Sequence, residues 1–235
     1  MKITLSFVLA LATTLPLFAQ QLDGTFRNEN DSIVFSGNNI YFSLRGFAGL
    51  HVLQVGEGTF EIENNLIVMQ AAEFSGERTT MQLLYGEYPD EIFVLVTSNQ
   101  NYLVQGVFVE TLDARGRTIE RHLTCRQGEA VFARADNVQR IRVSMMGYDN
   151  ITFDYVSGYD FHATIVPHEV VENSTVVFRF NRINDDTLSL LLLSTDFQEG
   201  RNRTRALQQL DNRAQRTNRM ERRFRKVLPP IDWRF

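Results

Sequence analysis

Carboxylates on two predicted loops are the residues of this chain that come closest to catalytic chemistry. Glu87, Asp90 and Glu91 lie in one turn-rich segment, and Asp185 and Asp186 lie in another. Two carboxylates can act as acid and base in glycoside hydrolysis when the fold places them on either side of a substrate. Most acids in turns are simply solvated, so a periplasmic hydrolase of unrecognised type is kept here as an alternative function.

Metal and nucleophile chemistry find little support in the residue spacing. His162 and His168 are six residues apart, which separates them by about 20 Å on an extended strand. Metal ligands lie only about 2 Å from their ion. The single Cys125 cannot form an internal disulfide, and no base is placed beside it by the sequence. We therefore predict no catalytic residue, no metal site and no cofactor.

Arginines near the C-terminus form the sharpest candidate site. Residues 201–235 hold eleven Arg or Lys and three Asp or Glu, a net charge of +8, whereas residues 20–200 hold twelve basic and twenty-five acidic residues, a net charge of −13. Apolar residues from Leu207 to Val227 recur at helical spacing, and Pro229 stops the pattern. This pattern predicts an Arg-rich amphipathic helical tail over 201–235. Its predicted partner-binding residues are Arg213, Arg216, Arg219, Arg222, Arg223 and Arg225.

Several partners fit a basic helix of this kind. An anionic membrane surface or lipopolysaccharide, an envelope protein and nucleic acid all attract clustered arginines. Nucleic acid is set aside because the chain is predicted to be exported and carries no nucleic-acid motif. Alternatively, the helix docks on the acidic body of the same chain. A docked helix favours a structural role, and a free helix favours recruitment of a partner.

The N-terminus has the three parts of a secretory signal peptide. Lys2 precedes an apolar segment over 3–17, and Ala19 offers a small residue at a plausible cleavage point. No later stretch approaches the 18 apolar residues of a membrane-spanning helix. We predict that residues 1–19 are removed and that the mature chain, without a transmembrane segment, is periplasmic or extracellular.

Short alternating strands separated by Gly and Asn turns fill residues 22–70. Parallel strands would need crossovers of about a dozen residues, for which there is no room. We predict an N-terminal antiparallel domain over 20–91, built as a meander or lipocalin-like sheet. If that sheet closed around a cavity, the protein could be a small-ligand carrier.

A second set of strands over 92–168 carries a recognisable order of motifs. They are GVFV at 106–109, DARG at 113–116, GEAVF at 128–132 and IRVSMMGY at 141–148. This ordered set resembles the transthyretin-like, carboxypeptidase-regulatory-like (Cna-B type) β-sandwich module. The resemblance implies a β-sandwich over 92–168, an accessory role without catalysis, and an exported protein of a Bacteroidota-like bacterium.

The pattern of residues 169–196 predicts one further hairpin. Val176, Phe178 and Phe180 alternate on one face, and residues 188–193 are almost entirely apolar. This hairpin is interpreted as completing the N-terminal sheet, with the sandwich inserted between, although two consecutive domains remain the simpler plan. The chain as a whole is predicted to be all-β with a C-terminal helix. Its predicted function is that of an exported non-catalytic binding or structural module of the cell envelope.

Overall fold

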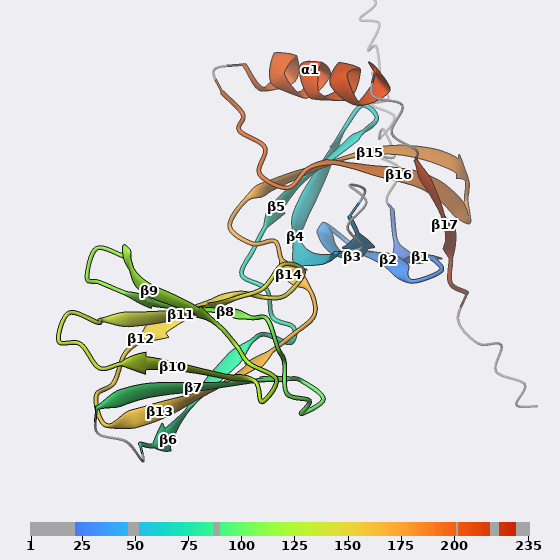
Figure 1. Cartoon of the computed structure of the whole chain (residues 1–235). Helices are drawn as coiled ribbons and strands as arrows, with labels where there is room; N and C mark the ends of the chain where they lie inside the picture. Colours follow the sequence, from blue (N-terminus) through green and yellow to red (C-terminus); the bar gives the residue numbers. More distant parts are fainter. Residues whose placement is uncertain (1–21, 47–51, 87–89, 201, 217–220, 229–235) are drawn as a thin grey trace, which may run out of the picture.

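The computed structural model describes residues 22–46, 52–86, 90–200, 202–216 and 221–228 (Figure 1). Most of these residues lie in β-strands, and the described part of the chain contains one α-helix, near its C-terminal end. The predicted all-β class with a C-terminal helix is therefore confirmed. The strands form two bodies, a closed barrel and a two-sheet sandwich.

The barrel has eight strands, each antiparallel to its neighbours. Pairing of the last strand with the first closes it, and the short strand β14 (Glu169–Val170) pairs with the first residues of β4 (Leu53–Glu63). In order around the barrel, the strands are β1 (Gly24–Asn28), β2 (Asp31–Ser36), β3 (Asn39–Arg45), β4 (Leu53–Glu63), β5 (Leu66–Ala71), β15 (Thr175–Asn184), β16 (Thr187–Ser194) and β17 (Arg222–Lys226).

Alternating side chains fill the barrel interior. On β2 and β3 the residues Ile33, Phe35, Ile40 and Phe42 all point inward and are almost completely buried. Phe35 packs edge-on against Phe60, 5.2 Å between ring centroids. A ligand carrier needs an open cavity in this place. The aromatic and aliphatic packing occupies it instead, so the interior offers no support for the carrier alternative.

Neighbouring barrel strands β5 and β15 are far apart in the sequence. They pair through Thr175↔Gln70 to Arg179↔Leu66, although residues 72–174 separate them along the chain. All strands of the sandwich lie within those residues. The sandwich is thus inserted into one connection of an otherwise sequential barrel.

The sandwich packs two four-stranded sheets around residues such as Ile92, Val109, Ile141 and Phe161. β6 (Thr80–Tyr85) pairs along its full length with β13 (Tyr159–Ile165), so the sandwich begins well before the boundary predicted at residue 91. One sheet has the order β10 (Glu129–Ala133), β7 (Glu91–Ser98), β13 (Tyr159–Ile165), β6 (Thr80–Tyr85). The other has the order β12 (Ile151–Asp154), β11 (Arg140–Ser144), β8 (Phe108–Leu112), β9 (Thr118–Leu123).

Helix α1 (Arg203–Arg216) lies on the outside of the barrel, where Leu207 and Ala214 pack against Leu191 and its neighbours. The prediction of one helix reaching Val227 is wrong, because Arg222–Lys226 form strand β17. Phe224 fills the barrel interior there, and the β17 backbone completes the ladders of both β16 and β1. Within the described residues, no helix is of the length and apolarity that a membrane span requires.

Ion pairs and hydrogen bonds of charged residues link the barrel and the sandwich where the chain passes between them. The Arg78 guanidinium lies 3.1 Å from Asp149 and 2.9 Å from Glu172. The same Asp149 carboxylate accepts a hydrogen bond from the Thr79 backbone at 2.9 Å. Glu169 accepts a further one from the backbone of Gly147, in the turn after β11. The turn that contains Gly147 and Tyr148 therefore faces the barrel.

Candidate binding surfaces

The predicted arginine set is divided between two elements. Arg213 and Arg216 are exposed in the last turn of α1, and Arg223 and Arg225 are exposed on β17. Arg219 lies outside the described residues. Three of the six predicted arginines, Arg222, Arg223 and Arg225, therefore lie on a strand of the barrel and not on the expected helix.

Arg222 has a structural role that the sequence did not suggest. Its side chain forms an ion pair with Asp31 at one end of the barrel. Asp31 is only 6% exposed and also accepts a hydrogen bond from the Arg45 backbone at 3.0 Å. Removing a buried, hydrogen-bonded pair partner would leave an uncompensated charge, so Arg222 is bound to the barrel rather than offered to a partner.

Helix α1 is docked on the barrel. Beneath it, the largely buried Arg179 lies 3.1 Å from Asp211 and 3.0 Å from Glu221. At its first turn, Arg203 pairs with Glu61 of β4, and that hydrogen bond raises the pKa of Arg203. Of the two positions considered for this helix, the docked one is observed.

Arg27 of β1 joins the exposed arginines of β17. Arg27 and Arg225 are direct cross-strand partners, and both point away from the barrel core. Among the residues that the structure describes, no Asp or Glu forms an ion pair with Arg27, Arg223 or Arg225. We call these three residues the outer arginine strip. Sequence reasoning missed Arg27 because only the closing pair of barrel strands brings it here.

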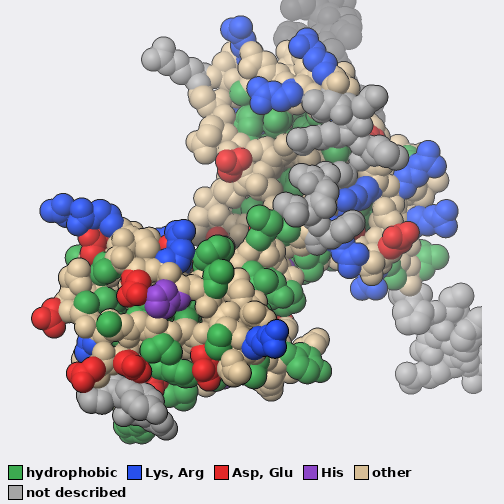
Figure 2. All heavy atoms as spheres, in the orientation of Figure 1, with side chains coloured by type: hydrophobic (Ala, Val, Ile, Leu, Met, Phe, Trp, Pro, Cys, Tyr) green, Lys and Arg blue, Asp and Glu red, His purple; other side chains and the backbone are tan. Residues whose placement is uncertain are grey.

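Arg27 and Arg225 are like charges directly opposite each other, an arrangement that destabilises a sheet. The wider surface around them is also basic. In Figure 2, Lys and Arg side chains gather over α1 and along the side of the barrel that carries β17, whereas acidic side chains are more frequent on the sandwich. The charge asymmetry of the sequence is therefore also an asymmetry between the two bodies of the molecule.

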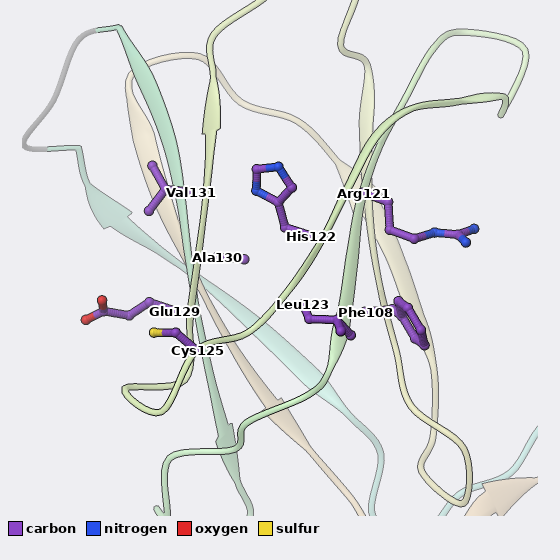
Figure 3. Close-up of a pocket in the computed structure, with 8 residues that line it drawn as sticks. All are labelled: Phe108, Arg121, His122, Leu123, Cys125, Glu129, Ala130 and Val131. Atoms are coloured by element: carbon purple, nitrogen blue, oxygen red, sulfur yellow. The ribbon is translucent and has the colours of Figure 1, made fainter.

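A groove opens on the sandwich between β9 and β10, with a volume of about 650 Å³ (Figure 3). Phe108, Leu123 and Val131 expose apolar surface at this groove. The Arg121 guanidinium lies 5.5 Å above the Phe108 ring centroid, a distance at which a cation is attracted to an aromatic face.

The groove does not assemble a nucleophile with a base. The His122 ring stacks on Phe132, 4.5 Å between centroids, and its Nε2 lies 2.9 Å from Glu120. The Cys125 sulfur lies 3.2 Å from the Gln127 side-chain oxygen. In Figure 3 the sulfur points away from the His122 ring. This arrangement can hold an apolar group, and it does not place the Cys125 sulfur beside the His122 ring.

The two groups of predicted loop carboxylates lie on different bodies. Asp90 and Glu91 are exposed at the start of β7 in the sandwich, and Glu87 is outside the described residues. Asp185 and Asp186 are exposed at the β15–β16 turn of the barrel, and Asp185 pairs with a neighbouring arginine. Within the described chain, no group of three or more His, Cys, Asp or Glu is arranged to hold a metal ion.

Comparison with known proteins adds little to this description. No protein-family model and no curated protein matches the chain. A solved structure of native alpha-2-macroglobulin from Escherichia coli, spanning domains MG0-NIE-MG1, is similar with a TM-score of 0.31 and 11% sequence identity. The match covers 54% of this chain and 58% of that chain. The fold and surfaces define a two-body all-β protein.

Proposed function

We propose that this protein is an exported, non-catalytic binding module of the cell envelope that engages an anionic lipid surface through the outer arginine strip. The observation that carries the proposal is the pairing of Arg27 with Arg225, both exposed, with no ion-pair partner among the described residues. Phosphate groups would offset the repulsion between these cations, because a guanidinium binds phosphate through two parallel hydrogen bonds.

Exposed apolar side chains near the strip favour a lipid surface over a purely polar partner. Ile183, Val227 and Leu228 are all at least 44% exposed. Ile183 lies beside the β15–β16 turn, and Val227 and Leu228 follow the end of β17. The two places are neighbours because Thr187 of β16 pairs with Arg225 of β17. Cations beside exposed apolar groups are typical of proteins that lie at a membrane interface. Asp23, Asp185 and Asp186 are described acids at this end, and Asp185 is paired with Arg182.

Export and an accessory role rest on the sequence. The apolar segment over 3–17 supports secretion, and the transthyretin-like motifs over 106–148 support a module without catalysis. In this proposal, Arg213 and Arg216 of the docked helix add to the same basic side of the barrel. The helix then contributes charge to the surface without leaving the body.

Vesicle co-sedimentation tests the proposal. We expect binding to vesicles that contain phosphatidylglycerol and no binding to vesicles of phosphatidylcholine alone. Binding should weaken with salt, because exposed charges are screened over about 10 Å at 0.1 M salt. Replacing both Arg223 and Arg225 by Ser should weaken binding about 30-fold, since each arginine near an anionic surface contributes about 1 kcal/mol.

A matched variant controls for net charge. Arg115 and Arg126 are also exposed but lie on turns of the sandwich. Replacing both by Ser removes the same charge and should leave vesicle binding close to that of the wild type. Equal losses in the two double variants would show that only net charge matters and would refute a specific strip.

A further inference from the structure

Strand β6 forms one edge of a sandwich sheet. It pairs with β13 from Tyr159↔Tyr85 to Thr164↔Thr80 without a register shift. No described strand pairs with its other side, and it lies at the margin of the sandwich in Figure 1. In an antiparallel ladder, alternate backbone N–H and C=O groups point to each neighbour. The outer half of these groups on β6 is therefore available to another strand.

β6 lacks the devices that usually protect an edge strand. Its sequence, TMQLLY, contains no charged residue and no proline, and its pairing contains no bulge. Leu83, Leu84 and Tyr85 are 43%, 40% and 89% exposed. An exposed, regular and apolar edge is a template for pairing with a further strand.

The other sheet edges of the described structure provide an internal comparison. Each of them carries at least one charged residue: Glu169 on β14, Glu129 on β10, Asp154 on β12, and Glu120 and Arg121 on β9. Charged side chains are a common way to keep edges from pairing. Only β6, among these edges, has none.

We propose that β6 pairs edge to edge with β6 of a second copy of this chain, antiparallel about a twofold axis. Such a pair is self-complementary, because each residue meets the same set of partners in both copies. An uncharged strand brings no like charges together, whereas the edges that carry acids would. The four-stranded sheet that contains β6 in one copy then continues into the same sheet of the other copy.

The proposed pairing also covers apolar side chains on both faces of the sheet. Leu83 and Tyr85 share the face of Phe161 and the sandwich core, where the open side leaves them exposed. Leu84 shares the opposite face with Asp160. A second copy would lengthen both faces and remove these side chains from water, which stabilises the pair through burial of apolar area.

Sedimentation velocity over a range of protein concentrations tests the proposal. The wild-type protein should sediment with twice the mass of one chain. Gln82 is exposed at the middle of β6, so Gln82→Lys should place two like charges near the twofold axis. We expect dimerisation to weaken at least about tenfold. Val131→Lys is the matched control, because Val131 is an exposed residue of the edge strand β10 in the same sheet. It should leave the dimer intact.

Disulfide trapping locates the interface. In a Cys125→Ser background, Gln82→Cys should form a linked dimer under mild oxidation, and Val131→Cys should not. Circular dichroism and thermal unfolding establish that the variants are folded. A wild-type protein that remains monomeric at its highest soluble concentration would overturn the proposal. So would a dimer that Gln82→Lys leaves unchanged, or a monomer whose β6 captures a strand of a different protein.

Discussion

Glu110 is a carboxylate held in its charged form on the outer face of the sandwich. It is 3% exposed and accepts hydrogen bonds from Arg121 at 2.5 Å and from Thr118 at 3.0 Å. Burial alone raises the pKa of Glu110. The hydrogen bonds from Arg121 and Thr118, together with the charges of Arg121 and Arg142, outweigh burial, so the pKa lies below its ordinary value.

This lowered pKa predicts how stability depends on pH. A carboxyl whose pKa is lower in the folded state stabilises the protein fully above its unfolded pKa, near 4.5. That stabilisation is lost as the pH falls through the folded pKa. Glu110→Gln should lower the free energy of unfolding by about 1–3 kcal/mol at pH 7. The difference from wild type, measured by urea denaturation, should shrink below about pH 4.5.

A nearby acid provides the control for this measurement. Glu120 lies on β9 but is exposed, so Glu120→Gln should change the free energy of unfolding by less than about 0.5 kcal/mol. If Glu110→Gln lost the same stability at every pH, a packing defect rather than the charge would explain the loss.

The outer arginine strip predicts the opposite sign for another substitution. Arg225→Thr removes one of two cations that face each other across β17 and β1. It should raise the free energy of unfolding by about 0.2–1 kcal/mol, while weakening binding to anionic vesicles. Arg223→Thr is the control for stability, because its register partner Ser189 is neutral. A loss of stability in Arg225→Thr would show that the two arginines do not repel each other in the folded protein.

β17 is the element in which local pattern and tertiary context disagree. Residues 207–227 place apolar groups at helical spacing, yet Arg222–Lys226 are a strand. The sequence RRFRK also alternates, with Phe224 between arginines, so both periods fit five residues. Closure of the barrel favours the strand, because the β17 backbone pairs with two neighbouring strands. In the strand, the Phe224 side chain also joins the barrel core.

Phe224→Ala should therefore destabilise the whole barrel. The Phe224 side chain is 1% exposed, and removing a buried phenyl ring costs about 3–5 kcal/mol. Thermal unfolding of this variant and of Arg223→Ala, its exposed neighbour, would measure the difference. Equal melting temperatures in the two variants would contradict a core role for Phe224. Deleting residues 201–235 would likewise open the barrel rather than remove a free tail.

At the scale of the whole molecule, the barrel and the sandwich are joined by two chain segments and a set of ion pairs. Arg78 connects Asp149 of the sandwich with Glu172, which precedes β15. Burial lowers the pKa of Arg78. The hydrogen bonds to both carboxylates and their negative charges raise this pKa by more than burial lowers it, so the net shift is upward. Arg78 therefore joins the two bodies through charges that meet only when both are folded.

Arg78→Ala should loosen this junction while leaving both bodies folded. The buried Asp149 carboxylate loses its cation, which should speed proteolysis within residues 72–79 and broaden the distance distribution from small-angle X-ray scattering. Arg117→Ala removes an exposed pair with Asp113 on a turn of the sandwich and should change neither observable. Unchanged cleavage in Arg78→Ala would mean that the connecting segments alone hold the orientation.

The sequence by itself determined most of the strands and the first part of the C-terminal helix. Alternation in residues such as Ile33 and Phe35, and helical spacing from Leu207 to Ala214, are local signals that burial on one face imposes. Only the tertiary structure decided which strands become neighbours. It assigned β6 to the sandwich, placed Arg27 against Arg225, and made a barrel strand of a predicted helix. These outcomes depend on pairing between distant segments, and a local pattern carries no information about its partner.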